Sequence, residues 1–239
     1  NHSKFKKKIK TIYGDIDYFN KSNLKIKNFK PEIAIHLASQ PLVLESYKKM
    51  KNTFQTNIMG TVNFFETIKH IKTIKKIIIF TSDKVYRNLD GKILNENSPL
   101  GGIDPYSASK SCQDIISTSY KTSIYKKNIE IIILRAGNII GGGDWNKYRL
   151  VPDIFKSIYK RKKFFIRNPN SIRPWQHIFE IINVFILIIA SKKKSNIFPD
   201  IYNIAPSKKS NVTVKELINQ IKKLGNYKNF KFFFKKNLK

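Results

Sequence analysis

Short apolar runs alternate along this chain with longer segments of helical spacing. Residues 32–37, 76–81 and 130–135 are almost continuously apolar, which predicts strands that are buried on both faces. Residues 200–204 predict one more strand. Strands that alternate with helices are typical of a parallel sheet covered by helices. The pattern therefore predicts an α/β fold.

The segments between these runs carry apolar residues at steps of three and four. Residues 50–74 show this spacing most clearly, with Phe54, Ile58, Val62 and Phe65 on one face of the predicted helix. A second helix is expected over residues 106–125, where Pro105 suits the first helical position. Shorter helices are predicted at 152–160, 180–190 and 212–224.

The composition supports a folded domain in a reducing compartment. The chain has 239 residues, of which 41% are hydrophobic, enough to bury a substantial core. Its single cysteine, Cys112, excludes a disulfide within the chain and a zinc site of several cysteines, so a cytoplasmic location and no metal are expected. The longest apolar stretch, 178–190, contains Glu180 and is too short to span a bilayer, so no membrane partner is expected.

The charge of the chain raises the question of nucleic-acid binding. Its formal net charge is +30, but lysines are scattered through nearly every segment rather than gathered in one stripe. The tail 227–239 is an exception, because Phe230 and the phenylalanines at 232–234 interleave with lysines. A stacking platform for bases is one interpretation of this tail. A buried strand with solvated lysines is the simpler one, and no nucleic-acid partner is expected.

Tyr106 and Lys110 form the first candidate for chemistry. Four residues apart, they lie on one face of the predicted helix. A phenol ordinarily has a pKa near 10, and a neighbouring ammonium stabilises the phenolate and lowers that pKa. By itself, this spacing also fits any surface helix.

Ser82, Asp83 and Lys84 provide further polar groups at the end of the predicted strand 76–81. A helix cap or turn would explain Ser82 and Asp83 equally well. However, open parallel sheets bind their ligands at the carboxyl ends of the strands, and the helix with Tyr106 and Lys110 comes next along the chain. We therefore expect the two groups of residues to converge.

These residues, Ser82-Asp83-Lys84 followed by Tyr106-x-x-x-Lys110, resemble the extended short-chain dehydrogenase/reductase family, and within it the nucleotide-sugar 4,6-dehydratases. The resemblance covers roughly residues 11–206. Further matching stretches occur in order at residues 36–43, 56–61, 104–107, 135–145 and 173–177. Lys84 favours CDP-glucose as substrate, since the similar dTDP-glucose enzymes carry a glutamate at that position.

The resemblance implies a Rossmann-like doubly wound parallel sheet with a smaller C-terminal substrate lobe. Residues 1–140, joined by 178–205, would form the NAD-binding domain, and 141–177 with 206–239 the substrate lobe. The family's first strand and its glycine-rich turn have no counterpart here, since the first glycine is Gly14. The chain is therefore expected to be a fragment that binds NAD poorly and is unstable by itself.

The implied reaction is that of a hydro-lyase. NAD would take a hydride from C4 of the sugar, while Tyr106 removes the O4 proton and Ser82 holds that oxygen. Lys84 would then act as base at C5 and Asp83 as acid at the C6 hydroxyl, so that water leaves and the hydride returns to C6. Such enzymes serve deoxysugar and polysaccharide synthesis. Another NAD-dependent epimerase or dehydratase, or an inactive fragment of one, remains the alternative.

The resemblance also implies binding residues and a partner. Asn138, Arg149 and Arg173 would hold the nucleotide sugar, because a planar guanidinium suits phosphate oxygens. Asp15 is expected at the cofactor, and the alternative is that its carboxylate only closes a turn. The helices at 50–74 and 106–125 would pair two copies into a homodimer. The residues expected at the cofactor are Asp15, Ile16, Leu37, Ala38, Ser39, Gln40, Asn57, Tyr106 and Lys110.

Overall fold

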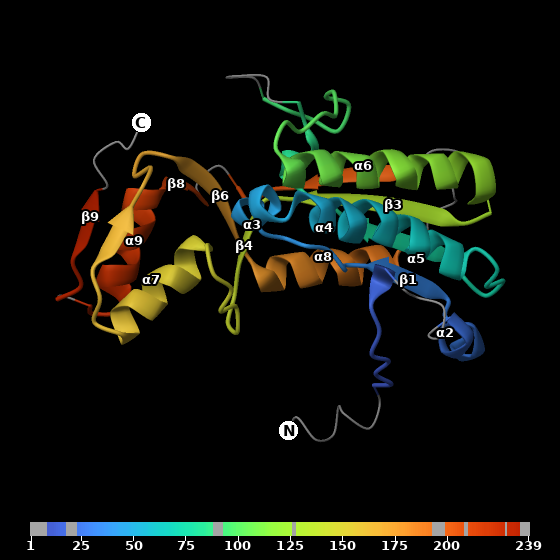
Figure 1. The fold of residues 1–239 in the computed structure, drawn as a ribbon, viewed down its shortest axis with the longest axis horizontal. Coiled ribbons are helices and arrows are strands. Elements are labelled where there is room, and N and C mark those ends of the chain that lie inside the picture. Colours follow the sequence, from blue (N-terminus) through green and yellow to red (C-terminus); the bar gives the residue numbers. More distant parts are fainter. Residues whose placement is uncertain are drawn as a thin grey trace. The chain divides into compact units, whose positions relative to one another are not determined.

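The computed structural model describes residues 9–17, 23–87, 93–125, 128–192, 199–207, 210–227 and 229–234 (Figure 1). The chain divides into two compact units. Unit 1 comprises residues 1–135 and 191–203, and unit 2 comprises 136–190 and 204–239. This division groups 178–190 with unit 2, whereas the sequence analysis assigns that segment to the NAD-binding domain.

Unit 1 is built on a four-stranded sheet, and the α/β expectation is confirmed. Its strand order is β1-β2-β3-β7. The β2 strand is parallel to β1, with Ile35 opposite Ile78, and parallel to β3, with Ile78 opposite Ile132. Every predicted strand forms, with bounds within one or two residues of the expected ones. These are β1 (Ile33–His36), β2 (Lys76–Phe80), β3 (Glu130–Ala136) and β7 (Asp200–Ile204).

The helices of unit 1 differ from the predicted ones in their ends. The segment predicted at 50–74 consists of α4 (Met50–Phe54), the π-helical turn η2 (Gln55–Met59) and α5 (Gly60–Ile68). It ends six residues early because Ile71 and Ile74 continue the apolar spacing in the turn that leads to β2, where both are buried. Two short helices were not predicted: α2 (Asn23–Phe29) and α3 (Val43–Lys48).

The second predicted helix begins where the sequence suggested. It consists of α6 (Pro105–Tyr120), continued by the π-helical turn η4 (Lys121–Tyr125). The α6 helix packs against α4, η2 and α5, alongside the sheet (Figure 1). Beneath these helices lies the main core, in which Phe65 is fully buried against Ile77, Ile79, Ile131 and Ile133.

Unit 2 contains two small sheets. In the first, β4 runs parallel and β8 antiparallel to the central β6, and in the second β5 and β9 are parallel. Its core is formed by Ile154, Ile166, Ile218 and Phe230. The elements are β4 (Asn138–Ile140), α7 (Leu150–Tyr159), β5 (Phe164–Ile166), β6 (Ile172–His177), α8 (Ile178–Ala190), β8 (Asn211–Thr213), α9 (Val214–Leu224) and β9 (Phe232–Phe234).

Two expectations for unit 2 need correction. The helix predicted from 212 begins at Val214, because Thr213 and Glu216 form a capping box that fixes its first turn. The phenylalanine run forms the predicted strand β9, but only Phe230 is well buried, at 8% exposure. Phe234 is 51% exposed, because β9 pairs with β5 alone in its sheet. None of the helices that the structure describes combines the length and apolar character needed to cross a membrane.

Truncating Phe65 should weaken unit 1 strongly. The Phe65 ring is fully buried and stacks on Tyr120 with ring centroids 4.5 Å apart. We expect Phe65→Ala to lower the free energy of unfolding by about 3–5 kcal/mol, measured by denaturant titration. Phe29→Ala is the control, since Phe29 is 63% exposed and should cost far less. Equal losses in the two variants would contradict the core described above.

Candidate active site

The first turn of α6 places Tyr106 and Lys110 in the interior of unit 1. Asp104 precedes the helix, and its carboxylate accepts a hydrogen bond from the Ser107 backbone N–H at 3.0 Å, while Pro105 occupies the first turn. Because the start of the helix is fixed in this way, the four-residue spacing puts Tyr106 and Lys110 on its buried face. Their exposures are 9% and 3%.

Lys110 is a buried amine with no protein acceptor. Its ammonium forms no hydrogen bond or ion pair with any residue that the structure describes. Burial lowers the pKa of Lys110 to about 8, and the negative charge of Asp114 opposes that change. An ammonium from which no described residue accepts a hydrogen bond can donate to a polar ligand.

Ser82 lies at the carboxyl end of β2. It caps the short helix η3 (Asp83–Val85), because its Oγ accepts a hydrogen bond from the Lys84 backbone N–H at 3.2 Å. The same hydroxyl donates to Asp83 Oδ1 at 3.1 Å. The capping alternative for Ser82 is thus confirmed. Ser82 is buried, whereas the side chains of Asp83 and Lys84 are exposed.

The η3 helix packs against α6, so the end of β2 and the Tyr106 helix meet as expected. Ser111 Oγ on α6 donates to the Val85 carbonyl oxygen at 2.7 Å and accepts from the Gly102 N–H at 3.2 Å. Gly102 must be a glycine, because a Cβ atom there would lie 2.2 Å from Ser107 Cβ. These contacts fix the loop that leads into α6 against η3.

Asn57 joins the loop after β1 to α6. Its Oδ1 accepts from the Gln40 backbone N–H at 2.7 Å, and its Nδ2 donates to the Gln40 carbonyl oxygen at 3.2 Å and to Ser109 Oγ at 2.8 Å. The side chain lies in the π-helical turn η2 and is fully buried. Of the residues predicted at the cofactor, Gln40 and Asn57 are therefore in direct contact.

A second buried network was missed in the sequence. His36 Nε2 lies 3.0 Å from Thr61 Oγ1, to which Gln113 Nε2 donates at 2.7 Å. Burial lowers the pKa of His36 to about 4, and the positive charge of Lys110 adds to that effect, so the imidazole is neutral. Gln113 lies seven residues after Tyr106, a spacing that could have placed it on the same buried face.

A groove of about 690 Å³ runs beside β1. Four of the predicted cofactor residues line it, namely Asp15, Ile16, Leu37 and Ala38. Asp15 Oδ1 accepts a hydrogen bond from the Asp17 backbone N–H at 3.0 Å, as in the turn alternative for this residue. Ser39 is partly buried and precedes Gln40.

The residues predicted to bind the substrate lie in unit 2. Asn138 opens β4 opposite Trp175 of β6, and Arg173 is exposed on β6. Arg149 precedes α7 and forms an ion pair with Asp144 at 3.3 Å. Across the described ranges, no group of three or more His, Cys, Asp or Glu side chains could hold a metal ion.

Comparison with known proteins identifies relatives of the whole chain. Residues 1–233 match the family described as GDP-mannose 4,6 dehydratase. The CDP-glucose 4,6-dehydratase of Salmonella typhimurium (strain LT2) is 44% identical over 182 residues, which cover 73% of this chain and 51% of that protein. The dTDP-D-glucose 4,6-dehydratase of Dictyostelium discoideum is 31% identical over 181 residues, covering 71% and 41%. The chain thus spans about half the length of these curated relatives.

Solved structures share the fold. The UDP-glucose 4-epimerase of Thermotoga maritima with UDP-glucose has a TM-score of 0.82 at 18% identity, covering 95% of this chain and 71% of that one. The UDP-glucuronic acid 4-epimerase of Bacillus cereus, in complex with UDP-glucuronic acid and NAD, also has a TM-score of 0.82, at 24% identity, covering 95% and 68%. The Rossmann-type fold expected from the sequence is confirmed.

Removing the buried amine should stabilise the protein at neutral pH. With a pKa of about 8 in the folded state against 10.5 unfolded, Lys110 binds its proton less tightly when folded. This opposes folding at low pH by roughly 3 kcal/mol, at 1.36 kcal/mol per pH unit. Lys110→Met should therefore unfold at higher denaturant at pH 7, and its advantage should shrink between pH 8 and 10.5. An advantage that stays constant over this pH range would contradict the assignment.

Proposed function

Because this chain belongs to the GDP-mannose 4,6 dehydratase family, we propose that it acts as a nucleotide-sugar 4,6-dehydratase, a hydro-lyase, with CDP-glucose as its substrate. The observation that carries the proposal is the buried pair Tyr106 and Lys110 on α6, packed against the helix that Ser82 caps. A phenol, an ammonium and a hydroxyl held in this way are the groups that proton removal from a sugar hydroxyl needs.

Tyr106 is the proposed base at O4 of the glucose. The Lys110 ammonium favours the phenolate, because an opposite charge nearby stabilises the ionised form. Ser82 holds the O4 oxygen by turning its hydroxyl proton from Asp83 Oδ1 to O4, while the capping bond keeps the Ser82 oxygen in place. As O4 loses its proton to Tyr106 and C4 its hydride, a ketone forms at C4.

NAD, when bound, would supply the acceptor for the C4 hydride and the source of the hydride for C6. The described residues fit such a group. Lys110 offers an ammonium from which no described residue accepts a hydrogen bond, and the groove beside β1 has room for an extended ligand. The residues that would hold it are Asp15, Ile16, Leu37, Ala38, Ser39, Gln40, Asn57, Tyr106 and Lys110.

The elimination is assigned to the two residues that follow Ser82. The C4 ketone acidifies the hydrogen at C5, so that the Lys84 amine can remove that proton. The Asp83 carboxyl group donates a proton to the departing C6 hydroxyl, so one water leaves and a C5–C6 double bond forms. When C6 receives the hydride, the Lys84 ammonium gives its proton back to C5. Both side chains are exposed, so a bound sugar can reach them.

Asn138, Arg149 and Arg173 are the proposed contacts to the nucleotide sugar. Arginine suits the pyrophosphate, because its planar group can donate two parallel hydrogen bonds to phosphate oxygens. Arg149 already binds the Asp144 carboxylate, which a pyrophosphate oxygen would replace or share. The nucleotide base and the sugar are the least constrained part of the proposal, so the experiment compares two substrates.

Mass spectrometry of CDP-glucose and dTDP-glucose tests the proposal, with each sugar incubated with NAD and the chain joined to the first strand and glycine-rich turn of the family. We expect CDP-glucose to lose one water. The variant Tyr106→Phe should lower kcat by about 10²- to 10⁴-fold, the usual contribution of a positioned general base. Tyr159→Phe is the matched control, because Tyr159 is 87% exposed on α7 and should leave the rate unchanged.

The outcomes separate the candidate functions. Dehydration of dTDP-glucose alone would refute the assignment of the CDP sugar and leave the reaction standing. Conversion without a change in mass, detected as a new sugar epimer, would favour the epimerase alternative. A folded protein that changes neither sugar would favour the inactive-fragment alternative.

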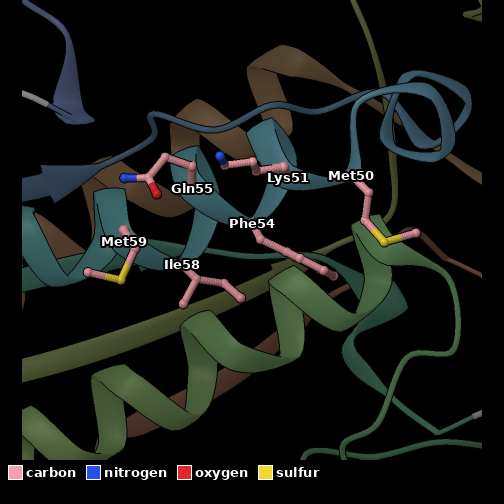
Figure 2. Close-up of a pocket in the computed structure, with 6 residues that line it drawn as sticks. All are labelled: Met50, Lys51, Phe54, Gln55, Ile58 and Met59. Atoms are coloured by element: carbon pink, nitrogen blue, oxygen red, sulfur yellow. The ribbon is translucent and has the colours of Figure 1, made fainter.

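We also propose that the protein forms a homodimer through the face carrying α4, η2 and α6. A hollow of about 570 Å³ on this face is lined by Met50, Lys51, Phe54, Gln55, Ile58 and Met59. Figure 2 shows the Phe54 and Ile58 side chains directed toward the neighbouring helix α6. Met50 and Met59 are 48% and 43% exposed, and Ile115 on α6 is 56% exposed. Apolar side chains clustered on a helical face are typical of subunit interfaces.

Light scattering after gel filtration tests the homodimer. Met59→Glu introduces a charge into the hollow and should convert the dimer to a monomer, because an unpaired charge is costly to bury in an interface. Leu224→Glu, at a position that is 86% exposed on α9, is the control and should leave the mass unchanged. A monomeric unmodified protein would refute the proposal.

A further inference from the structure

A buried ion pair lies one helical turn beyond Lys110. Asp114 on α6 accepts a hydrogen bond at its Oδ2 from Arg135 Nε at 2.6 Å, and Arg135 Nη2 forms an ion pair with the same oxygen at 2.5 Å. Arg135 is at the carboxyl end of β3. The side chains of Asp114 and Arg135 are 1% and 2% exposed. The pair therefore holds two charges well away from solvent.

Arg135 is held by more than its carboxylate partner. Its Nη1 donates to the Tyr86 hydroxyl at 2.7 Å and to the Glu96 carbonyl oxygen at 3.0 Å, and its guanidinium lies 4.9 Å from the centre of the Tyr86 ring. Tyr86 in turn donates to Asn203 Oδ1 at 2.5 Å. These contacts fix the guanidinium, and so they fix the position of the Asp114 carboxylate.

Arg135 contacts only one of the two carboxylate oxygens of Asp114. Its second oxygen, Oδ1, is buried and accepts no hydrogen bond. Burial raises the pKa of Asp114, and the charge and hydrogen bonding of Arg135, the neighbouring Thr81 hydroxyl and the charge of Lys110 offset only part of that rise. The carboxylate therefore acts on two cations, one that it binds directly and one at the candidate active site.

Asp83 of η3, which packs against α6, is also a carboxylate, but its side chain is exposed and its charge does not contribute to the pKa of Lys110. His36 of β1 is neutral, since its pKa is about 4, and in its cationic form it would repel the ammonium. Tyr106 precedes Lys110 by one turn and is the group that Lys110 serves in the proposed reaction. Burial by itself disfavours the ammonium. Asp114 is thus the group that opposes the loss of the Lys110 proton.

We propose that Asp114, held in place by Arg135, is a positioning residue that keeps Lys110 protonated at neutral pH. This inference rests on the proposed function, because it assigns the ammonium its task of favouring the Tyr106 phenolate. The Asp114 carboxylate acts only through Lys110. The alternative is that the pair with Arg135 serves stability alone, as buried ion pairs elsewhere in the chain can.

Another buried ion pair provides a matched control. Lys76 Nζ lies 3.1 Å from Glu130 Oε2, and their side chains are 7% and 9% exposed. Glu130 opens β3, the strand on which Arg135 lies near the other end. Asp114→Asn and Glu130→Gln therefore each remove one carboxylate from a buried ion pair next to the same strand. They differ in position, because Asp114 lies one helical turn from Lys110 on α6, whereas Glu130 lies at the start of β3.

The experiment follows the Lys110 amine directly. NMR of the protein labelled with ¹³C at lysine Cε gives its titration, and the resonance is assigned by its absence in Lys110→Met. In Asp114→Asn we expect Lys110 to lose its proton at a pH on the order of one unit lower, as the loss of a nearby opposite charge predicts. Glu130→Gln should leave the titration unchanged. Asp114→Glu, which keeps the charge, should restore it.

A second variant covers the case in which Asp114→Asn fails to fold. The double variant Asp114→Asn with Arg135→Gln leaves no unpaired charge buried, and Lys110 should again lose its proton at lower pH, because the Asp114 charge is the one that acts on it. An unchanged titration in whichever of these two folds would overturn the proposal. An equal displacement in Glu130→Gln would do the same.

The titration also separates this inference from the proposed function. If Lys110 behaves as expected but the unmodified protein dehydrates neither sugar, the charge arrangement stands and the dehydratase assignment fails. If the protein is active, the alkaline limb of its pH–rate profile should move to lower pH in Asp114→Asn and stay in place in Glu130→Gln. A limb that does not move while activity falls would indicate a purely structural role.

Discussion

The structure of unit 1 depends on a helix whose buried face is polar. The α6 helix buries four serines together with Lys110, Gln113 and Asp114, in addition to Tyr106. Each polar group withdrawn from water needs a partner, because an unmatched donor or acceptor in the interior costs about 1–3 kcal/mol. Three surrounding elements meet this need: η3 contacts Ser111, the π-helical turn η2 contacts Ser109, and β3 contacts Asp114.

This requirement makes the position of α6 specific in a way that apolar packing would not. An apolar helix can shift by a fraction of a turn and keep most of its contacts, whereas α6 would lose several directional hydrogen bonds at once. The same bonds join β1, β2 and β3 through their carboxyl ends. Three groups on this face lack a hydrogen-bond partner among the described residues: the Lys110 ammonium, Gln113 Oε1 and Asp114 Oδ1. Of these, Lys110 is the only cation, and its amine lies one turn from Tyr106 at the candidate site.

The sequence predicted the parts of this arrangement that depend on local pattern. The isoleucine runs at 77–79 and 131–133 are apolar enough to predict buried strands without knowledge of their partners. Asp104 and Pro105 predict a helix start, because the Asp104 side chain caps the first turn locally. What the sequence could not predict depends on distant partners. Asn57 and Ser109 are 52 positions apart, and nothing near either residue indicates their bond. The short strands β4, β5, β6 and β8 also lack a distinct period, and the exposure of Phe234 follows from the pairing of β9 with β5 alone.

The place of β1 in the sheet has a consequence for how the chain behaves in solution. Within the described ranges β1 is the terminal strand, paired only with β2, and a groove lined by apolar residues such as Ile33 and Phe29 lies beside it. The outer backbone groups of an edge strand are a template on which another extended segment can add. Association between molecules through this edge would compete with folding as concentration rises. The edge at β1 thus offers a second molecule a place to pair while the core of unit 1 stays intact.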